Sequence, residues 1–253
     1  MRGVILAGGS GSRLLPLTKV TNKHLLGVGK EPMLFHPIGK LVRAGIKDIL
    51  VVTGTEHAGS IFQLLGSGIE FGCEFTFKVQ QEANGICGAL SLARDFVRGD
   101  PFVVILGDNV FQEELRGYAS IFNERLLGGL HGSTPCGMIF LKRVDDPNRH
   151  GVAVLENGKI KRMIEKPKED ISPFAVIGLY FYRGQGVFDY IDSLRPSARG
   201  ELEITELNTL LLEHGKLWHQ ELPGYWTDAG THESLWKANY LLNSTKLEGN
   251  NGR

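Results

Sequence analysis

Short apolar runs alternate with helix-like stretches along the first half of this chain, and this alternation limits the fold more than any other feature. The runs are rich in β-branched residues and cover residues 3–7, 48–54, 73–80 and 101–108. Helix-like stretches lie between or after them, at about 32–44, 57–65, 85–97 and 112–126. Near-continuous apolar strands separated by helices are typical of a parallel sheet with both faces covered. The ligand crevice of such an α/β fold lies outside the carboxyl ends of its strands, so we expect a site in the loops after residues 7, 80 and 108.

From about residue 135 the pattern changes to consecutive strand-like runs joined by turns, including the Asn157-Gly158 pair that is typical of a hairpin. This indicates a second sector that is rich in antiparallel strands. Two helices, at about 203–214 and 231–243, flank a short strand within residues 216–222. We therefore predict one domain over residues 1–243, with sectors at about 1–134 and 135–243, followed by a flexible tail at 244–253.

The charge balance and the absence of special segments narrow the classes of partner. The chain has 28 basic and 28 acidic residues, which gives no electrostatic reason to expect nucleic acid or a membrane surface. No run approaches the ~18 apolar residues of a membrane span, and the N-terminus lacks a signal pattern, so we expect a cytoplasmic protein. Three cysteines, Cys73, Cys87 and Cys136, show no metal-ligand spacing and are interpreted as free thiols.

The stretch "LAGGSGSRL" at residues 6–14 breaks the first strand with glycines, serines and an arginine. It fits neither a dinucleotide fingerprint nor a Walker loop, because Leu14 stands where those motifs need glycine or lysine. Its glycines still allow backbone N–H groups to approach an anion, and Arg13 can bind phosphate oxygens with two donors. Lys23 can add a compact positive charge. The stretch alone leaves two readings open, a glycine-rich turn or a phosphate-binding loop.

Two aspartates are candidates for a hard-metal site. Asp108 follows an apolar strand at the edge where the crevice opens, and Asp228 lies just before a predicted helix. Mg²⁺ binds through one or two protein carboxylates together with substrate phosphates. The alternatives are a turn residue at Asp108 and a helix cap at Asp228. The nearby histidines, His24, His150 and His232, lack metal-ligand spacing and are interpreted as structural or solvated.

Six motifs together resemble those of the sugar-1-phosphate nucleotidyltransferases, in that family's order and spacing: "LAGGSGSRLLPLT", "NKHLL", "ILGDN", "GVAVLENGKIKRMIEKP", "ARGELEIT" and "WTDAGTH". The similarity extends from about residue 2 to about residue 240. It implies a Rossmann-like nucleotidyltransferase fold in the α/β class, with a mainly parallel central sheet flanked by helices. The first sector would then bind nucleotide, and the antiparallel sector would bind sugar.

The resemblance also assigns roles to matching positions. It implies catalytic roles for Arg13, Lys23 and Lys166, and it implies Mg²⁺ as a cofactor on Asp108 and Asp228. The implied nucleotide-binding positions are Leu6, Gly8, Gly9, Gly11, Ser12, Arg13, Gln80, Gly85 and Asp108, with Gln80 and Gly85 at the pyrimidine base. The implied sugar-phosphate positions are Gly107, Gly151, Glu165, Lys166, Val176 and Arg199.

Within the family, the motifs are most similar to those of members that use dTTP and α-D-glucose 1-phosphate to make dTDP-glucose and pyrophosphate. The resemblance therefore implies these two substrates and a homo-oligomer, either a dimer or a tetramer. A uridylyltransferase or another sugar-1-phosphate nucleotidyltransferase is an alternative within the same fold. An alternative of another class is a catalytically silent sensor of nucleotide sugars, although the joint presence of Arg13, Lys23, Asp108, Lys166 and Asp228 favours an enzyme.

Overall fold

The first half of the chain forms the parallel part of one nine-stranded sheet. The computed structural model describes residues 1–127 and 135–250. The parallel strands lie in the order β6-β1-β4-β5 and are β1 (Arg2–Ala7), β4 (Asp48–Gly54), β5 (Glu74–Gln80) and β6 (Pro101–Leu106). They coincide with the four apolar runs, so this part of the fold prediction is confirmed.

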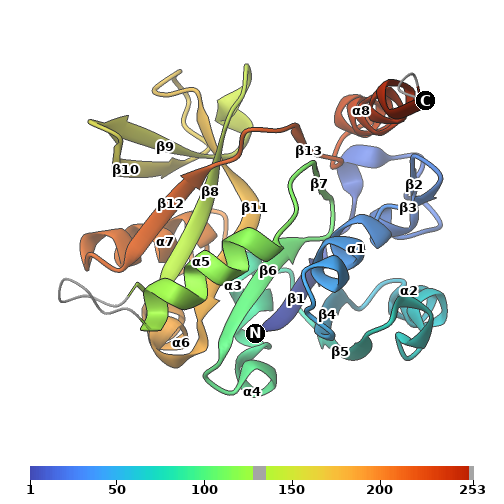
Figure 1. Cartoon of the computed structure of the whole chain (residues 1–253), viewed down its shortest axis with the longest axis horizontal. Helices are drawn as coiled ribbons and strands as arrows, with labels where there is room; N and C mark the ends of the chain where they lie inside the picture. The colour runs from blue at the N-terminus through green and yellow to red at the C-terminus, as the bar shows by residue number, and fades with distance from the viewer. Residues whose placement is uncertain (128–134, 251–253) are drawn as a thin grey trace.

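Helices cover both faces of these strands (Figure 1). One face packs against α1 (Phe35–Arg43), α2 (Ala58–Leu65) and α5 (Arg116–Leu127), through strand residues such as Ile5, Val51 and Ile105. The alternate strand residues, such as Val4 and Val104, face α3 (Ile86–Ser91) and α4 (Arg94–Val97). The sequence predicts a single helix over 85–97, whereas the structure divides it into these two short helices.

The second half of the chain continues the same sheet with mostly antiparallel pairs. β11 (Phe174–Arg183) is antiparallel to β6, and it also pairs with β8 (Gly137–Arg143) and β9 (Gly151–Glu156). β9 forms a hairpin with β10 (Lys159–Glu165), and the two turn residues, Asn157 and Gly158, have φ values of 50° and 73°. The predicted antiparallel sector and its hairpin are thus confirmed, with β12 (Leu217–Glu221) added parallel to β8. Because β11 joins the halves through β6, the two sectors share one sheet.

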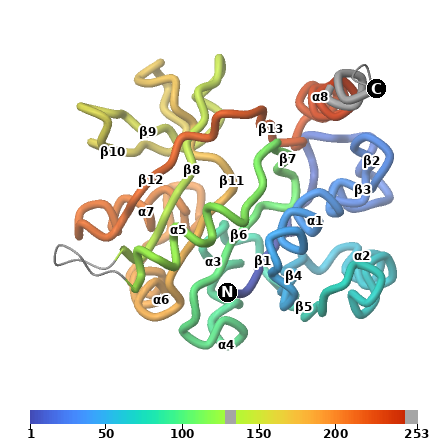
Figure 2. The backbone as a smooth tube through the Cα atoms, viewed as in Figure 1, coloured from blue at the N-terminus to red at the C-terminus, as the bar shows by residue number. Residues whose placement is uncertain are grey.

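The last part of the chain returns to the carboxyl edge of the parallel strands. After β12 the chain crosses to β13 (Trp226–Asp228), which forms a small sheet with β7 (Asn109–Phe111), as Figure 2 shows along the top of the view. α7 (Ile204–Glu213) lies where it is predicted. α6 (Gly184–Ser193) has no predicted counterpart. α8 (His232–Asn250) continues past residue 243, so the first residues of the predicted tail are helical and residues 251–253 lie outside the described ones.

The remaining elements are short. The strands β2 (Gly27–Val28) and β3 (Glu31–Pro32) pair with each other, and single 3-10 turns occur at η1 (Ser12–Leu14), η2 (Lys23–Leu25), η3 (Ile69–Phe71) and η4 (Pro147–Arg149). Among the described residues, none of the helices combines the length and apolar character that crossing a membrane requires.

Candidate active site

Two cavities open at the carboxyl edge of the sheet, and they share Arg13 and Asp108. We call the first the glycine-loop cavity; among the predicted positions it is lined by Leu6, Gly8, Gly9, Arg13, Lys23, Gln80, Gly85 and Asp108. We call the second the hairpin cavity; among the predicted positions it is lined by Arg13, Asp108, Gly151, Glu165, Lys166, Val176, Arg199 and Asp228. The structure thus brings together most of the residues that the sequence singles out.

Three predicted positions line neither cavity. Gly11 and Ser12 lie at the start of η1, where the hydroxyl of Thr18 donates to the Gly11 carbonyl at 2.8 Å. Gly107 is backed by His24, because a Cβ on Gly107 would lie 2.6 Å from the His24 ring. Gly11, Ser12 and Gly107 therefore lie next to residues that line the cavities but do not line them themselves.

The conformation of the glycine loop follows from adjacent strand ends. Leu6 and Leu106 are paired in the parallel register of β1 and β6, so the loops after these strands begin side by side. Gly9 and Gly11 have φ values of 96° and 64°, in the left-handed region that side chains disfavour. A Cβ on Gly9 would meet no atom within 4 Å, which leaves the loop backbone open toward the cavity.

Lys23 and Asp108 form a close ion pair between the two loops. The Lys23 Nζ lies 2.5 Å from Asp108 Oδ2, and the two side chains are only 14% and 11% exposed. Burial would raise the pKa of Asp108, but the charge of Lys23 and the hydrogen bonds from Lys23 and Asn109 outweigh it and hold the pKa below its usual value. Asp108 is therefore a carboxylate at any physiological pH.

His24 supports this pair from a fully buried position. Burial and the charge of Lys23 lower its pKa to about 3, so the ring is neutral. Its Nδ1 lies 2.7 Å from the side-chain oxygen of Asn22, which can only accept, so Nδ1 carries the proton. The structural role predicted for His24 agrees with this geometry.

Asp228, the last residue of β13, lies beside Asp108. It pairs with Asn109 across the small sheet, and the backbone N–H of Ala229 donates to the Asp108 carbonyl at 2.7 Å. A Cβ on Gly230 would lie 3.4 Å from Asp228 Oδ2 and 3.5 Å from Asp108 Oδ2, so the two carboxylates converge beside this glycine. The alternative role as a cap of α8 is not what the structure shows, because Ser234 N donates to Thr231 Oγ1 at 3.2 Å instead.

The convergence of two carboxylates is electrostatically unfavourable without a cation. Burial and the charge of Asp108 raise the pKa of Asp228 to about 6. Within the described residues no group of three or more acidic, histidine or cysteine side chains is arranged to hold a metal ion. Two carboxylates are nevertheless what Mg²⁺ takes from a protein when substrate phosphates supply other ligands. The donor set therefore fits a magnesium ion that arrives with substrate.

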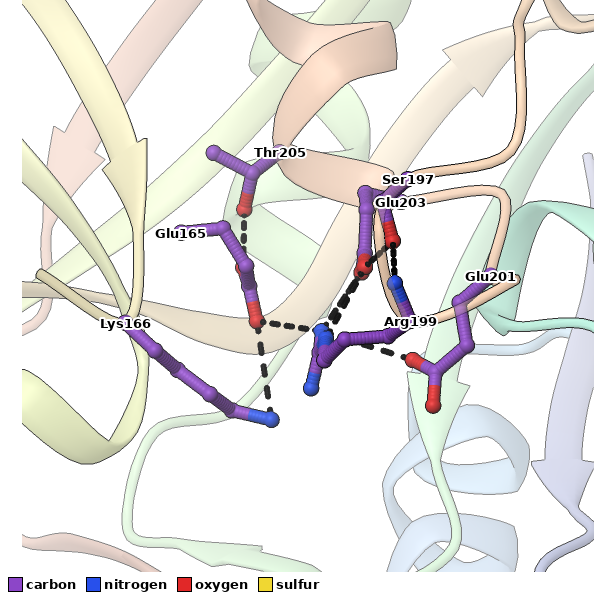
Figure 3. A network of polar contacts seen from close by, with 7 residues as sticks. All are labelled: Glu165, Lys166, Ser197, Arg199, Glu201, Glu203 and Thr205. Carbon is purple, nitrogen blue, oxygen red and sulfur yellow. Dashed lines mark hydrogen bonds and ion pairs between the residues drawn. The ribbon is translucent and has the colours of Figure 1, made fainter.

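Figure 3 shows a network of charged residues, several of which line the hairpin cavity. Arg199 Nη2 donates to both carboxylate oxygens of Glu203, at 2.8 and 2.9 Å, and lies 3.3 Å from Glu165. Lys166 Nζ lies 3.7 Å from the same oxygen of Glu165, and Thr205 donates to the other oxygen at 2.5 Å. Figure 3 shows Lys166 and Arg199 reaching Glu165 from two sides. Glu165 is thereby fixed with one oxygen facing two cations.

Sequence reasoning missed several residues of this site. Asn109 directly follows Asp108, and its amide bonds to Asp108, to the Gly178 N–H and to the Trp226 ring; its place in "GDN" is the signal that could have identified it. Glu203, at the start of a predicted helix, and Thr205 are not among the residues that the sequence motifs single out. His150 packs edge-on against Trp226 at 5.1 Å, and burial together with Arg149 lowers its pKa to about 4.

Comparison with known proteins identifies the family. The family model described as "Nucleotidyl transferase" matches residues 2–245. A glucose-1-phosphate thymidylyltransferase of Neisseria meningitidis is 42% identical over 94% of this chain and 81% of its own length. A Bacillus anthracis crystal structure, described as a candidate glucose-1-phosphate thymidylyltransferase in complex with sucrose, has a TM-score of 0.88 at 51% identity, covering 95% of this chain and 94% of its own.

A more distant solved structure, described as UDP-glucose pyrophosphorylase complexed with UDP-glucose, shares the fold alone. Its TM-score is 0.81 at 23% identity, over 96% of this chain and 98% of its own. The predicted Rossmann-like nucleotidyltransferase fold and family resemblance are confirmed. The chain therefore belongs to the nucleotidyl transferase family of enzymes.

Proposed function

We propose that this chain transfers a deoxythymidylyl group from dTTP to α-D-glucose 1-phosphate, giving dTDP-glucose and pyrophosphate with the help of Mg²⁺. The observation that carries the proposal is the pair of cavities that share Arg13 and Asp108. A nucleoside triphosphate in the glycine-loop cavity and a sugar phosphate in the hairpin cavity would meet at these two residues. Relatives named glucose-1-phosphate thymidylyltransferase support this choice of substrates.

The segment from Gln80 to Gly85, which the family resemblance places at the base of the nucleotide, favours a pyrimidine that carries a proton on N3. The Gln80 amide nitrogen donates to Asn84 Oδ1 at 2.8 Å and lies 3.3 Å from the Gly85 carbonyl. The amide oxygen of Gln80 is thus the atom that can accept the N3–H of a base. Thymine and uracil carry that proton and cytosine does not, so CTP would leave a polar group of the site unpaired.

The reaction needs alignment and charge compensation more than a base. An oxygen of the sugar phosphate is anionic at neutral pH, so it can attack the α-phosphorus as the bond from that phosphorus to the bridging oxygen breaks and pyrophosphate leaves. The main obstacle is repulsion between two highly charged reactants, which positioned cations relieve. Arg13 and Lys23 border the triphosphate side of this contact, and Lys166 borders the sugar side.

The carboxylates of Asp108 and Asp228 would hold the magnesium ion. When bound, Mg²⁺ supplies Lewis-acid stabilisation of phosphate oxygens. Lys23 keeps Asp108 ionised and oriented through its 2.5 Å contact. The His24 ring packs against Gly107 and stays neutral at physiological pH, because its pKa is about 3.

A substrate matrix tests the proposal. Pyrophosphate release would be measured with dTTP, UTP, CTP and ATP, each against glucose 1-phosphate and N-acetylglucosamine 1-phosphate, in the presence and absence of Mg²⁺. We expect the fastest release with dTTP, glucose 1-phosphate and Mg²⁺, and none with CTP. A preference for UTP would favour the uridylyltransferase alternative, and no release from any pair would favour the silent sensor.

A further inference from the structure

Arg149 lies in the hairpin cavity, although no sequence motif pointed to it. The short turn η4 ends at Arg149 and places it directly before His150 and the first residue of β9, Gly151. The contacts of its guanidinium among the described residues are long: Nη2 donates to Thr231 Oγ1 at 3.4 Å, and Nε lies 3.9 Å from Asp146 Oδ2. The donors of Arg149 therefore remain largely available to a ligand.

Arg199, the other arginine near the proposed sugar phosphate, is paired more closely than Arg149. Arg199 Nε and Nη2 both donate to Glu203, and Nη2 also lies 3.4 Å from Glu201. Lys166 shares Glu165 with Arg199 at 3.7 Å. A phosphate must compete with Glu203 and Glu201 for Arg199, whereas the carboxylate of Asp146 lies 3.9 Å from the Arg149 guanidinium.

The charge balance of the hairpin cavity favours phosphate binding by a cation that is not closely paired. Among the described residues, five carboxylates and four cations line it, namely Asp108, Glu165, Glu201, Glu203 and Asp228 against Arg13, Arg149, Lys166 and Arg199. A sugar 1-phosphate adds further negative charge. Paired cations are already neutralised by their carboxylates, so an arginine with free donors compensates the phosphate most effectively.

Arg149 also borders the segment that carries the proposed metal ligand. Its Nη2 contacts Thr231, while Arg13 Nη2 lies 3.0 Å from where a Cβ on Gly230 would be. The charges of both arginines act on Asp228. Arg13 lines both cavities and Arg149 lines the hairpin cavity. This placement assigns Arg13 to the region where the two substrates meet and Arg149 to the sugar side.

We propose that Arg149 is a further catalytic residue that binds the phosphate of the sugar 1-phosphate, together with Lys166, and holds its attacking oxygen toward the α-phosphorus. This inference rests on the proposed function. It names a planar, two-donor contact to phosphate oxygens that neither the paired Arg199 nor the single ammonium of Lys166 can supply.

The test compares Arg149→Gln, Arg149→Lys and the control Arg162→Gln. Arg162 is exposed on β10 in the same sector, so its replacement removes one positive charge outside both cavities. For Arg149→Gln we expect the KM for glucose 1-phosphate to rise roughly 10- to 100-fold, because glutamine removes the positive charge and the two-donor contact to the phosphate. We expect Arg149→Lys to show a smaller rise and Arg162→Gln to show none.

Binding of dTTP, measured by calorimetry in Mg²⁺, separates this role from others. It should stay within about twofold of the wild type in every variant, because Arg149 is placed on the sugar side. An unchanged KM for the sugar phosphate in both Arg149 variants overturns the inference, and so does an equal loss of dTTP binding. If Arg149→Gln does not fold, Arg149→Lys carries the comparison. Failure of the proposed function is distinguishable, because the wild type would then release no pyrophosphate from dTTP and glucose 1-phosphate.

Discussion

The two cavities of this enzyme meet at Arg13 and Asp108 but are constructed differently. The glycine-loop cavity is formed at the ends of adjacent parallel strands, where backbone, a single close ion pair and a neutral buried histidine determine its shape. The hairpin cavity is formed on antiparallel strands and is lined by a network of paired side chains.

This difference predicts which kinetic constant a substitution in each cavity should change. In the glycine-loop cavity, Lys23 and Asp108 hold each other in a close ion pair, so removing either should reduce the rate of the chemical step. In the hairpin cavity, charges balance one another, so removing one should mainly shift affinity for the sugar. Substitutions in each cavity test this contrast.

The largest effect is expected at the shared carboxylate. Asp108→Asn or Lys23→Ala should lower turnover by at least ~10²-fold, because each removes a charge from the site of phosphoryl transfer. Steady-state kinetics with dTTP and glucose 1-phosphate provide the measurement, with Arg162→Gln as the control. Near-normal turnover in either variant would remove the distinction between the two cavities.

A smaller effect, on the affinity for glucose 1-phosphate, is expected when the charged network around Arg199 and Glu203 is altered. Glu203→Gln takes the closest charged partner from Arg199. The guanidinium would then pair with Glu165 and Glu201, which lie 3.3 and 3.4 Å away, rather than with the phosphate, so the KM for glucose 1-phosphate should rise about tenfold with kcat nearly unchanged. Glu206→Gln, on the exposed face of the same helix α7, is the matched control. A drop in kcat at unchanged KM would contradict an affinity role for this network.

The buried His24 beside the glycine-loop cavity should make the free energy of unfolding depend on pH. His24 has a folded pKa of about 3 against 6.5 when unfolded, so the unfolded chain binds the extra proton below pH 6.5. Stability from this group is therefore complete above pH 6.5 and is lost as pH falls toward 3, with a slope of up to about 1.4 kcal/mol per pH unit. Denaturant unfolding between pH 7 and 5 measures that slope.

His24→Gln should reduce the slope, whatever its effect on absolute stability. His150, whose pKa is lowered to about 4, contributes in the same direction, and Asp228, whose pKa is raised to about 6, contributes in the opposite direction. Replacing the exposed His214 by Gln should leave the slope unchanged. An unaltered slope in His24→Gln would show that another group governs acid sensitivity in this range.

The smallest effect is expected at the hairpin turn. Gly158 has a φ of 73°, so Gly158→Ala should destabilise the protein by about 1 kcal/mol without reaching the site chemistry. Gly59→Ala in α2 is a contrasting control, because nothing lies within 4 Å of its Cβ and alanine favours helix; it should stabilise by roughly 0.5–1 kcal/mol. Thermal unfolding measures both, and effects of equal sign would contradict the assigned conformations.

Much of the fold was predictable because it depends on local patterns. Apolar runs specify the parallel strands, and the Asn157-Gly158 pair specifies the hairpin, since both follow from side-chain period and backbone preference. α6 and the β7–β13 sheet were not predictable, because α6 begins at glycines and β7 and β13 are only three residues each. The division of residues 85–97 into α3 and α4 was also not predictable, because the apolar pattern in this stretch is continuous.

The strand ends, the glycine loop and the family could be predicted from the amino-acid sequence, because contiguous residues carry them. The folded structure was needed to show that Asp228 lies beside Asp108, that Arg199 is already paired with Glu203 and that Arg149 is not closely paired. These facts depend on residues that are distant in the chain and on the competition among charges in one cavity. Spacing along the sequence contains no information about which charges are paired in space.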